Sequence, residues 1–177
     1  MKIIMTGTPA DIKAKEEDKE FLNDLRAAFP DVTFETAGTV EEQKLRVRDA
    51  DAYYGWPPRE VFLEAQRLRW VHLPGTGMDR MTEIPEMIES DVALTNCRGP
   101  HAPAMADHVM GMVITLAHQL HEQWQDQREH RWGMIKYSRR QVELSGSTMG
   151  ILALGDIGSQ VARRAYGFGM KVYAVDR

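Results

Sequence analysis

The chain has 177 residues, a length that fits one large domain or two small ones. Hydrophobic residues make up 43% of it and charged residues 27%, and its formal net charge is -4, as in ordinary soluble globular proteins. This balance excludes the broad basic surface with which proteins bind nucleic acid or anionic membranes.

The sequence has neither the pattern of a signal peptide nor that of a membrane span. Lys2 to Thr6 has the composition of a first strand and lacks the long apolar core of a signal peptide. No apolar run approaches the roughly 18 residues that span a bilayer. Cys97 is the single cysteine, which excludes an internal disulfide framework and fits a reducing compartment. We therefore expect a cytoplasmic protein.

The first hundred residues alternate between strand and helix patterns. Predicted strands cover residues 2–6, 32–36, 52–55, 69–73 and 92–95. Predicted helices cover residues 16–29, 41–48 and 59–66. In the first of these helices one face is apolar and contains Phe21, Leu22, Leu25 and Phe29. Such alternation predicts an α/β fold with a parallel sheet that helices cover on both faces.

The composition changes at residues 96–100, which we interpret as a hinge. Pro103 then opens a long helix as a first-turn proline. Apolar residues at helical spacing predict its packed face: Ala102, Met105, Val109, Met112, Val113, Leu116 and Leu120. The polar and basic segment 123–140, with Trp124 and Trp132, predicts an extended arm that packs against another surface, such as a second subunit.

The last thirty residues have the pattern of a dinucleotide-binding fold. An apolar strand over residues 148–154 breaks into a glycine turn, a helix follows over residues 159–166, and a second strand over residues 170–175 ends at Asp176. Ile157, Val161 and Ala165 are expected on one face of the helix. A dinucleotide-binding fold begins with these elements in this order: a strand, a glycine turn, a helix, a second strand and an acidic residue.

Four residues of the turn are predicted to bind the pyrophosphate of a dinucleotide: Gly155, Asp156, Ile157 and Gly158. Backbone N–H groups at the start of the helix can receive the phosphates, and the helix dipole favours their charge. Gly155 lets the backbone approach the phosphates, and Gly158 lets the helix pack close to the strand. The first glycine of the G-x-G-x-x-G pattern is Ala153 here, so the match is A-x-G-x-x-G.

The acid at the end of the second strand indicates which dinucleotide is bound. Asp176 lies 18 residues after Gly158, where a carboxylate can accept hydrogen bonds from ribose hydroxyls. Because this carboxylate would repel a 2′-phosphate, the pattern favours NAD over NADP. Arg177 weakens the preference, since an arginine there can hold a phosphate.

Other polar motifs are less informative. Gly75-Thr76-Gly77 follows a strand and exposes successive N–H groups, which suit a substrate carboxylate, but a plain turn explains it as well. His118 and His121 can share a helix face without a third ligand, so no metal site is predicted. Cys97 is interpreted as structural rather than nucleophilic.

Five segments together resemble the D-isomer-specific 2-hydroxyacid dehydrogenases: residues 68–79, 94–101, 106–108, 144–158 and 161–177. The resemblance implies a flavodoxin-like substrate domain over residues 1–99 and the start of a Rossmann NAD-binding domain over residues 100–177. It implies that backbone groups at Thr76 and Gly77 hold the carboxylate of a small 2-hydroxy or 2-oxo acid, and that Met105 lies near the nicotinamide. It also implies a homodimer formed through the long helix and the arm. Asp107 departs from the family, which commonly has glutamate there.

The groups that perform the family's chemistry, a substrate-orienting arginine and a histidine–glutamate pair, follow the second Rossmann strand. No residue of this sequence is therefore assigned a catalytic role. We expect the N-terminal part of such a dehydrogenase, truncated after that strand and inactive by itself. Two alternatives stay open: a non-catalytic nucleotide-binding or dimerisation module, and one half of a split enzyme.

Overall fold

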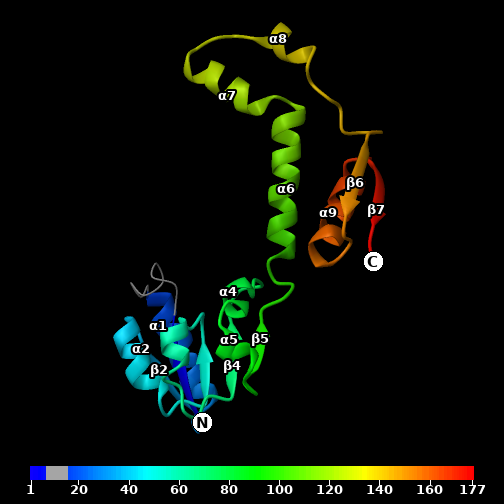
Figure 1. Ribbon diagram of the computed structural model, residues 1–177. Coiled ribbons are helices and arrows are strands. Elements are labelled where there is room, and N and C mark those ends of the chain that lie inside the picture. Colours follow the sequence, from blue (N-terminus) through cyan, green and yellow to red (C-terminus); the bar gives the residue numbers. More distant parts are fainter. Residues whose placement is uncertain (7–15) are drawn as a thin grey trace. The chain divides into compact units, whose positions relative to one another are not determined.

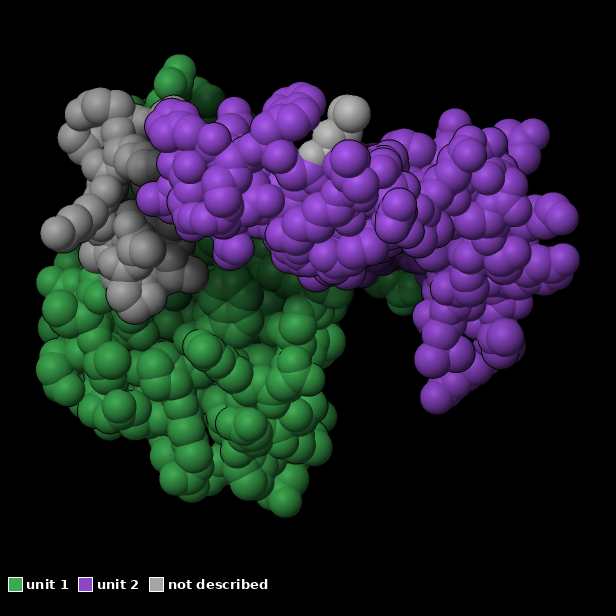
Figure 2. All heavy atoms as spheres, turned by 90° about the horizontal axis from the view of Figure 1, so that it is seen from above, with its two compact units in different colours: residues 1–98 green, residues 99–177 purple. Residues whose placement is uncertain are grey.

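A computed structural model of the protein describes residues 1–6 and 16–177 (Figure 1). The chain divides into two compact units, residues 1–98 and residues 99–177 (Figure 2). The boundary between the units lies inside the predicted hinge at residues 96–100. In the part of the chain that the structure describes, every helix is too short or too polar to cross a membrane.

Unit 1 is built on a parallel sheet. Its strands within the described residues are β1 (Lys2–Met5), β2 (Thr33–Thr36), β3 (Ala52–Tyr54), β4 (Trp70–Leu73) and β5 (Ala93–Asn96). They lie in the order β2-β1-β3-β4-β5, and every neighbouring pair is parallel. This is the strand order of flavodoxin-like folds, so the predicted fold class is confirmed.

The helices of unit 1 agree with the prediction only in part. The described ones are α1 (Glu16–Ala28), α2 (Val40–Val47), α3 (Arg59–Phe62), α4 (Asp79–Thr82) and α5 (Pro85–Ile88). The helix predicted over residues 59–66 ends at Phe62, and α4 and α5 were not predicted. Each of these three helices has four residues, which is too short for a helical period to show in the sequence.

The alternation of side chains along the strands gives the sheet two different faces. The register aligns Ile4, Tyr53, Val71 and Leu94 in one row across four strands. The first three of these residues are at most 1% exposed and pack with residues of α2 to α5 in the core. The hydroxyl of Tyr53 donates to Gln43 Oε1 at 2.9 Å, and burial raises the pKa of Tyr53 to about 12.

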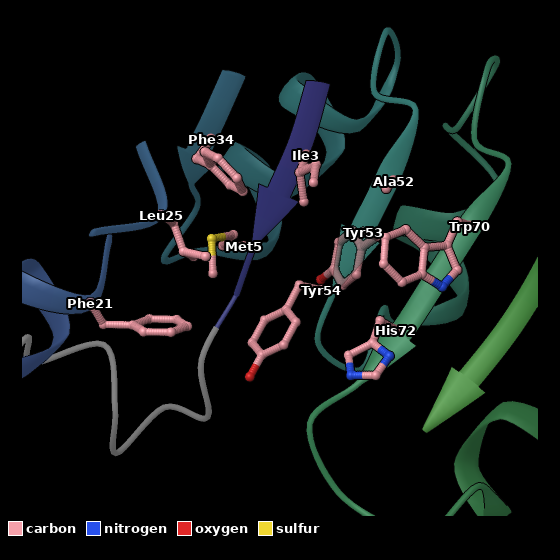
Figure 3. A pocket seen from close by; sticks show the side chains of 10 residues that line it. All are labelled: Ile3, Met5, Phe21, Leu25, Phe34, Ala52, Tyr53, Tyr54, Trp70 and His72. Atoms are coloured by element: carbon pink, nitrogen blue, oxygen red, sulfur yellow. The ribbon is translucent and has the colours of Figure 1, made fainter. Parts of the chain in front are cut away.

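The opposite face of the sheet has an apolar hollow beside α1 (Figure 3). In the next row of the register, Met5, Tyr54 and His72 lie on neighbouring strands and line this hollow. The rings of Tyr54 and His72 stack with their centroids 5.8 Å apart. Phe21 and Leu25 of α1 complete one side of the hollow, on the apolar helix face that the sequence predicted.

Unit 2 contains a β-α-β element and the helices that precede it. Its described elements are α6 (Ala102–Ala117), α7 (Leu120–Arg128), α8 (Met134–Ser138), β6 (Thr148–Leu152), α9 (Asp156–Gly167) and β7 (Lys171–Val175). Strands β6 and β7 are parallel, with Thr148 opposite Lys171 and Leu152 opposite Val175. Helix α9 connects them and packs against α6, and this part agrees with the predicted start of a Rossmann domain.

The predicted packed face of α6 is partly wrong. Ala102, Ala106 and Met110 are at most 5% exposed, and Ala106 and Met110 form the core with residues of α9. Three members of the predicted stripe remain 49–60% exposed: Met105, Met112 and Leu116. The small alanines allow a close approach of α9, and this selects the contact face more strongly than the count of apolar residues does.

The segment predicted as an extended arm is instead folded into α7 and α8. Gln119 has a φ of 58°, which ends α6 and starts the new direction of α7. Asp126 is 7% exposed and accepts hydrogen bonds from the Tyr137 hydroxyl and from Arg131 Nη2, the latter at 2.7 Å. Because a carboxylate with several donors can organise a local polar core, this segment folds without a large apolar interior.

Candidate functional site

The loop between β4 and α4 carries the candidate substrate residues, and the end of β5 holds it in place. The backbone N–H of Cys97 donates to Leu73 O at 3.2 Å and to Gly75 O at 3.1 Å. Thr76 Oγ1 donates to Cys97 O at 2.9 Å, and Asn96 Nδ2 donates to Thr76 O at 2.8 Å. The loop thus lies at the carboxyl edge of a parallel sheet, where ligands bind in open α/β folds.

Gly75, Thr76 and Gly77 differ in their surroundings. A Cβ atom added to Gly75 would lie 2.9 Å from Cζ2 of Trp56, so the indole ring closes one side of the loop. Thr76 and Gly77 are exposed. Trp56 therefore supports the loop by packing against Gly75, and it also packs against the core of unit 1.

His72 connects the loop to the hollow on the sheet. Its Nδ1 lies 2.8 Å from Thr95 Oγ1, and its Nε2 lies 3.5 Å from Cys97 Sγ. Trp70 Nε1 donates to the same Thr95 hydroxyl at 2.8 Å. His72 is thus partnered on both nitrogens, as expected of a packed residue, and its side chain lines the hollow next to that of Tyr54 (Figure 3).

The glycine turn of unit 2 has two glycines with different roles. A Cβ atom on Gly158 would lie 2.1 Å from Ala153 O, so only glycine lets α9 start this close to β6. A Cβ atom on Gly155 would meet no atom within 4 Å, and the φ of Gly155 is -69°. The space beside Gly155 is therefore open to a ligand that approaches the start of α9.

Ala153 stands where the dinucleotide pattern has its first glycine, and its backbone is left-handed. Its φ is 74°, a conformation that costs an L-residue roughly 1–2 kcal/mol. Ala153 N donates to Val175 O at 2.8 Å, so the turn follows directly from the pairing of β6 and β7. Alanine at this position thus adds strain to the turn.

The predicted acid lies beside this turn. Since β6 and β7 are parallel and Leu152 pairs with Val175, Asp176 and the turn are at the same edge of the sheet. The Asp176 carboxylate accepts a hydrogen bond from the Arg177 backbone N–H at 3.1 Å, and both residues are exposed. This arrangement brings Asp156, Ile157 and Asp176 to one end of unit 2, although Ile157 is 40% exposed rather than packed with Val161 and Ala165.

Met105 and Asp107 lie in the first turns of α6. Met105 is 49% exposed, and its predicted position near a nicotinamide stays a prediction. Asp107 Oδ1 accepts a hydrogen bond from Arg164 Nε of α9 at 2.6 Å, and Arg164 Nη2 donates to Pro103 O at 3.2 Å. Arg164 therefore joins α6 and α9.

Among the described residues there is no group of three or more histidine, cysteine or acidic side chains that could hold a metal ion. His118 and His121 lie on opposite sides of the left-handed Gln119, so the expectation that they share a helix face is wrong.

Sequence reasoning missed Asn96 and Arg164. Asn96 ends a strand, and only the tertiary structure shows that its amide reaches the neighbouring loop. Arg164 is separated from Asp107 by 57 residues, so no local pattern relates the two.

Comparison with known proteins relates the chain to a family of dehydrogenases. Residues 110–177 match the family model described as D-isomer specific 2-hydroxyacid dehydrogenase, NAD binding domain. The chain is 29% identical to hydroxypyruvate reductase of Thermotoga maritima over 117 residues, which are 66% of this chain and 37% of that protein. It is 31% identical to glyoxylate reductase of Korarchaeum cryptofilum over 137 residues, which are 74% of this chain and 41% of that protein.

A solved structure shares the fold. The D-isomer specific 2-hydroxyacid dehydrogenase family protein of Aeromonas salmonicida aligns with a TM-score of 0.83 at 24% identity, over 99% of this chain and 53% of that one. This chain thus spans about half the length of that protein, and less than half the length of the two relatives above. Residues 110–177 belong to an NAD-binding domain. The resemblance to the D-isomer-specific 2-hydroxyacid dehydrogenases is therefore confirmed, and residues 110–177 are the part that the family model matches.

Proposed function

We propose that this chain supplies the substrate domain and the first part of the NAD-binding domain of an NAD-dependent dehydrogenase. The complete enzyme transfers a hydride between the nicotinamide and the C2 carbon of a small 2-hydroxy or 2-oxo acid. The observation that carries the proposal is the glycine turn, where open space beside Gly155 and close packing at Gly158 lie at the same sheet edge as Asp176.

The cofactor-binding residues follow from this turn. The first N–H groups of α9, from Asp156 to Gly158, would bind the pyrophosphate, since the start of a helix favours negative charge. Asp176 would accept hydrogen bonds from the ribose hydroxyls, with Arg177 beside it. The exposed carboxylate supports NAD over NADP, because a 2′-phosphate would lie close to it.

The substrate residues belong to unit 1. The exposed N–H groups of Thr76 and Gly77 would bind the carboxylate of the acid, with Gly75 held against Trp56. Met105, which is half exposed in the second unit, would lie near the nicotinamide. No residue is assigned to polarise the carbonyl group or to deliver the proton, and we expect the 177-residue chain to lack turnover.

Two measurements on the 177-residue chain test this proposal. The first is NADH binding followed by the fluorescence of the dihydronicotinamide, with NADPH as the comparison. The second is NADH oxidation with glyoxylate, pyruvate and hydroxypyruvate. We expect NADH to bind more tightly than NADPH, without oxidation. Absence of binding would refute the nucleotide site, and turnover would refute the inactivity of the chain.

Exposed aromatic residues support a homodimer formed through α6, α7 and α8. Trp124 is 63% exposed and Trp132 is 88% exposed, and Met112 and Leu116 of α6 remain more than half exposed. Exposed large apolar and aromatic side chains are typical of interfaces. The same observation favours the second candidate function, a dimerisation module without catalysis. Light scattering on the wild type and on Trp124→Ser tests the dimer, and a monomeric wild type would contradict it.

We further propose that the protein acts in the cytoplasm. The single cysteine, Cys97, is a free thiol, which suits a reducing compartment. Fractionation of cells that express a tagged chain would test this localisation.

A further inference from the structure

The end of β5 holds two successive carbonyl groups of the candidate substrate loop. Gly75 O accepts from the backbone N–H of Cys97 at 3.1 Å. Thr76 O accepts from the side-chain amide of Asn96 at 2.8 Å. Asn96 is partly buried at the last position of its strand. Both contacts therefore fix peptide units of the loop rather than side chains.

These contacts also determine the direction of two N–H groups in the loop, because a peptide unit is planar. In a trans peptide unit the carbonyl and the N–H of the following residue point in opposite directions. Because the Gly75 carbonyl points at Cys97, the N–H of Thr76 points away from β5. Because the Thr76 carbonyl points at Asn96, the N–H of Gly77 points away from β5 as well. Neither N–H donates to an acceptor within residues 1–6 and 16–177.

We propose that Asn96 is a positioning residue that holds the Gly75–Gly77 loop ready for a carboxylate. This inference rests on the proposed function, in which Thr76 and Gly77 bind the substrate. Any residue except proline at position 97 can supply the backbone N–H that holds Gly75 O. The bond to Thr76 O comes from a side chain, so it depends on the identity of residue 96.

The loss of this amide has a specific consequence. The peptide unit between Thr76 and Gly77 would no longer be held, and glycine tolerates the backbone angles that its rotation requires. A rotated unit presents the Thr76 carbonyl oxygen where a carboxylate binds, in place of the Gly77 N–H. The partial negative charge on this carbonyl oxygen repels the carboxylate, so binding is weakened without a change in the fold.

Pyruvate binding followed by NMR of the full chain tests the proposal. We expect pyruvate to shift the Thr76 and Gly77 amide resonances of the wild type. In Asn96→Asp at neutral pH the new carboxylate cannot donate to Thr76 O, and we expect binding weaker by about tenfold or more. Below about pH 4 the introduced carboxyl is protonated and donates again, so pyruvate affinity returns toward that of the wild type.

A matched control and a ligand-free measurement complete the test. Ser90→Ala removes a hydrogen bond from Ser90 Oγ to Met87 O, 2.8 Å long, before the amino end of β5. It should leave pyruvate binding unchanged. Without ligand, we expect the N–H order parameters of Thr76 and Gly77 to be about 0.85 in the wild type and below about 0.6 in Asn96→Ala.

The outcomes distinguish the positioning role of Asn96 from the carboxylate site at Thr76 and Gly77. Equal order parameters in the wild type and Asn96→Ala, or equal pyruvate affinity of the wild type and Asn96→Asp at neutral pH, would overturn the role of Asn96. A wild type with an ordered loop but no pyruvate shift would instead overturn the carboxylate site in the proposed function, and the positioning role with it.

Discussion

Gly155 and Gly158 are three residues apart in the same turn, yet a methyl group at each should have opposite effects. In Gly158→Ala the new Cβ would lie 2.1 Å from Ala153 O and 3.2 Å from Ala153 C. Carbon–oxygen contacts normally begin at about 3.3 Å, so α9 or the turn must move by about 1 Å. Overpacking of this kind costs about 1–3 kcal/mol.

In a unit of this size, the cost should lower the melting temperature by a measurable amount. For a unit of residues 99–177, each kcal/mol lowers Tm by about 4–8 °C. Gly155→Ala should instead be neutral or slightly stabilising, by about 0.4–1 kcal/mol, because its φ of -69° suits alanine. The same variant should lose NADH affinity, since its methyl group occupies the open space beside the start of α9.

Thermal unfolding followed by circular dichroism and NADH fluorescence titration of both variants check this pair of effects. The expected pattern is low stability for Gly158→Ala, and normal stability without nucleotide binding for Gly155→Ala. Equal loss of stability in the two variants would refute the packing argument. Unimpaired NADH binding by Gly155→Ala would refute the proposed approach of the pyrophosphate.

Three further predictions concern unit 2. Ala153→Gly should raise the free energy of unfolding by about 0.5–1 kcal/mol in thermal melts, because the relief of a left-handed alanine exceeds the entropy that glycine loses on folding; an unchanged or lower Tm would contradict it. The Tyr137 hydroxyl and then Arg131 lower the pKa of Asp126 to about 2, below its ordinary 3.8. The hydrogen bonds to this carboxylate therefore stabilise the α7–α8 segment above about pH 4 and are lost as the pH falls toward 2. NMR of the Tyr137 ring can follow this loss. Asp126→Asn should remove the pH dependence, and a pH dependence of the Tyr137 signals that persists in the variant would disprove the role of Asp126. Asp107→Asn should destabilise unit 2 by only about 0.2–1 kcal/mol in urea titration, because Asp107 is 70% exposed in its pair with Arg164, and a larger loss would show that the pair does more than join two helices.

The candidate site was predictable wherever a local pattern reports a backbone requirement. The glycines at 155 and 158 and the acid at 176 follow from a strand, a tight turn and a helix that are continuous in the chain. The contact face of α6 was not predictable in this way, because it has more than one apolar face and α9 selects the one with small side chains. The folding of α7 and α8 around Asp126 was also missed, since polar cores leave no hydrophobic period in a sequence.

By itself, the sequence determined the α/β alternation, the region of the boundary between the two units and the glycine turn, because each depends on neighbours within a few positions. Only the tertiary structure decided which side chains hold those pieces in place. Asn96 reaches a loop that begins some twenty residues earlier, and Arg164 reaches Asp107 across 57 residues. Such contacts depend on parallel strands ending at one sheet edge and on helices packing side by side, and those arrangements exist only after the chain has folded.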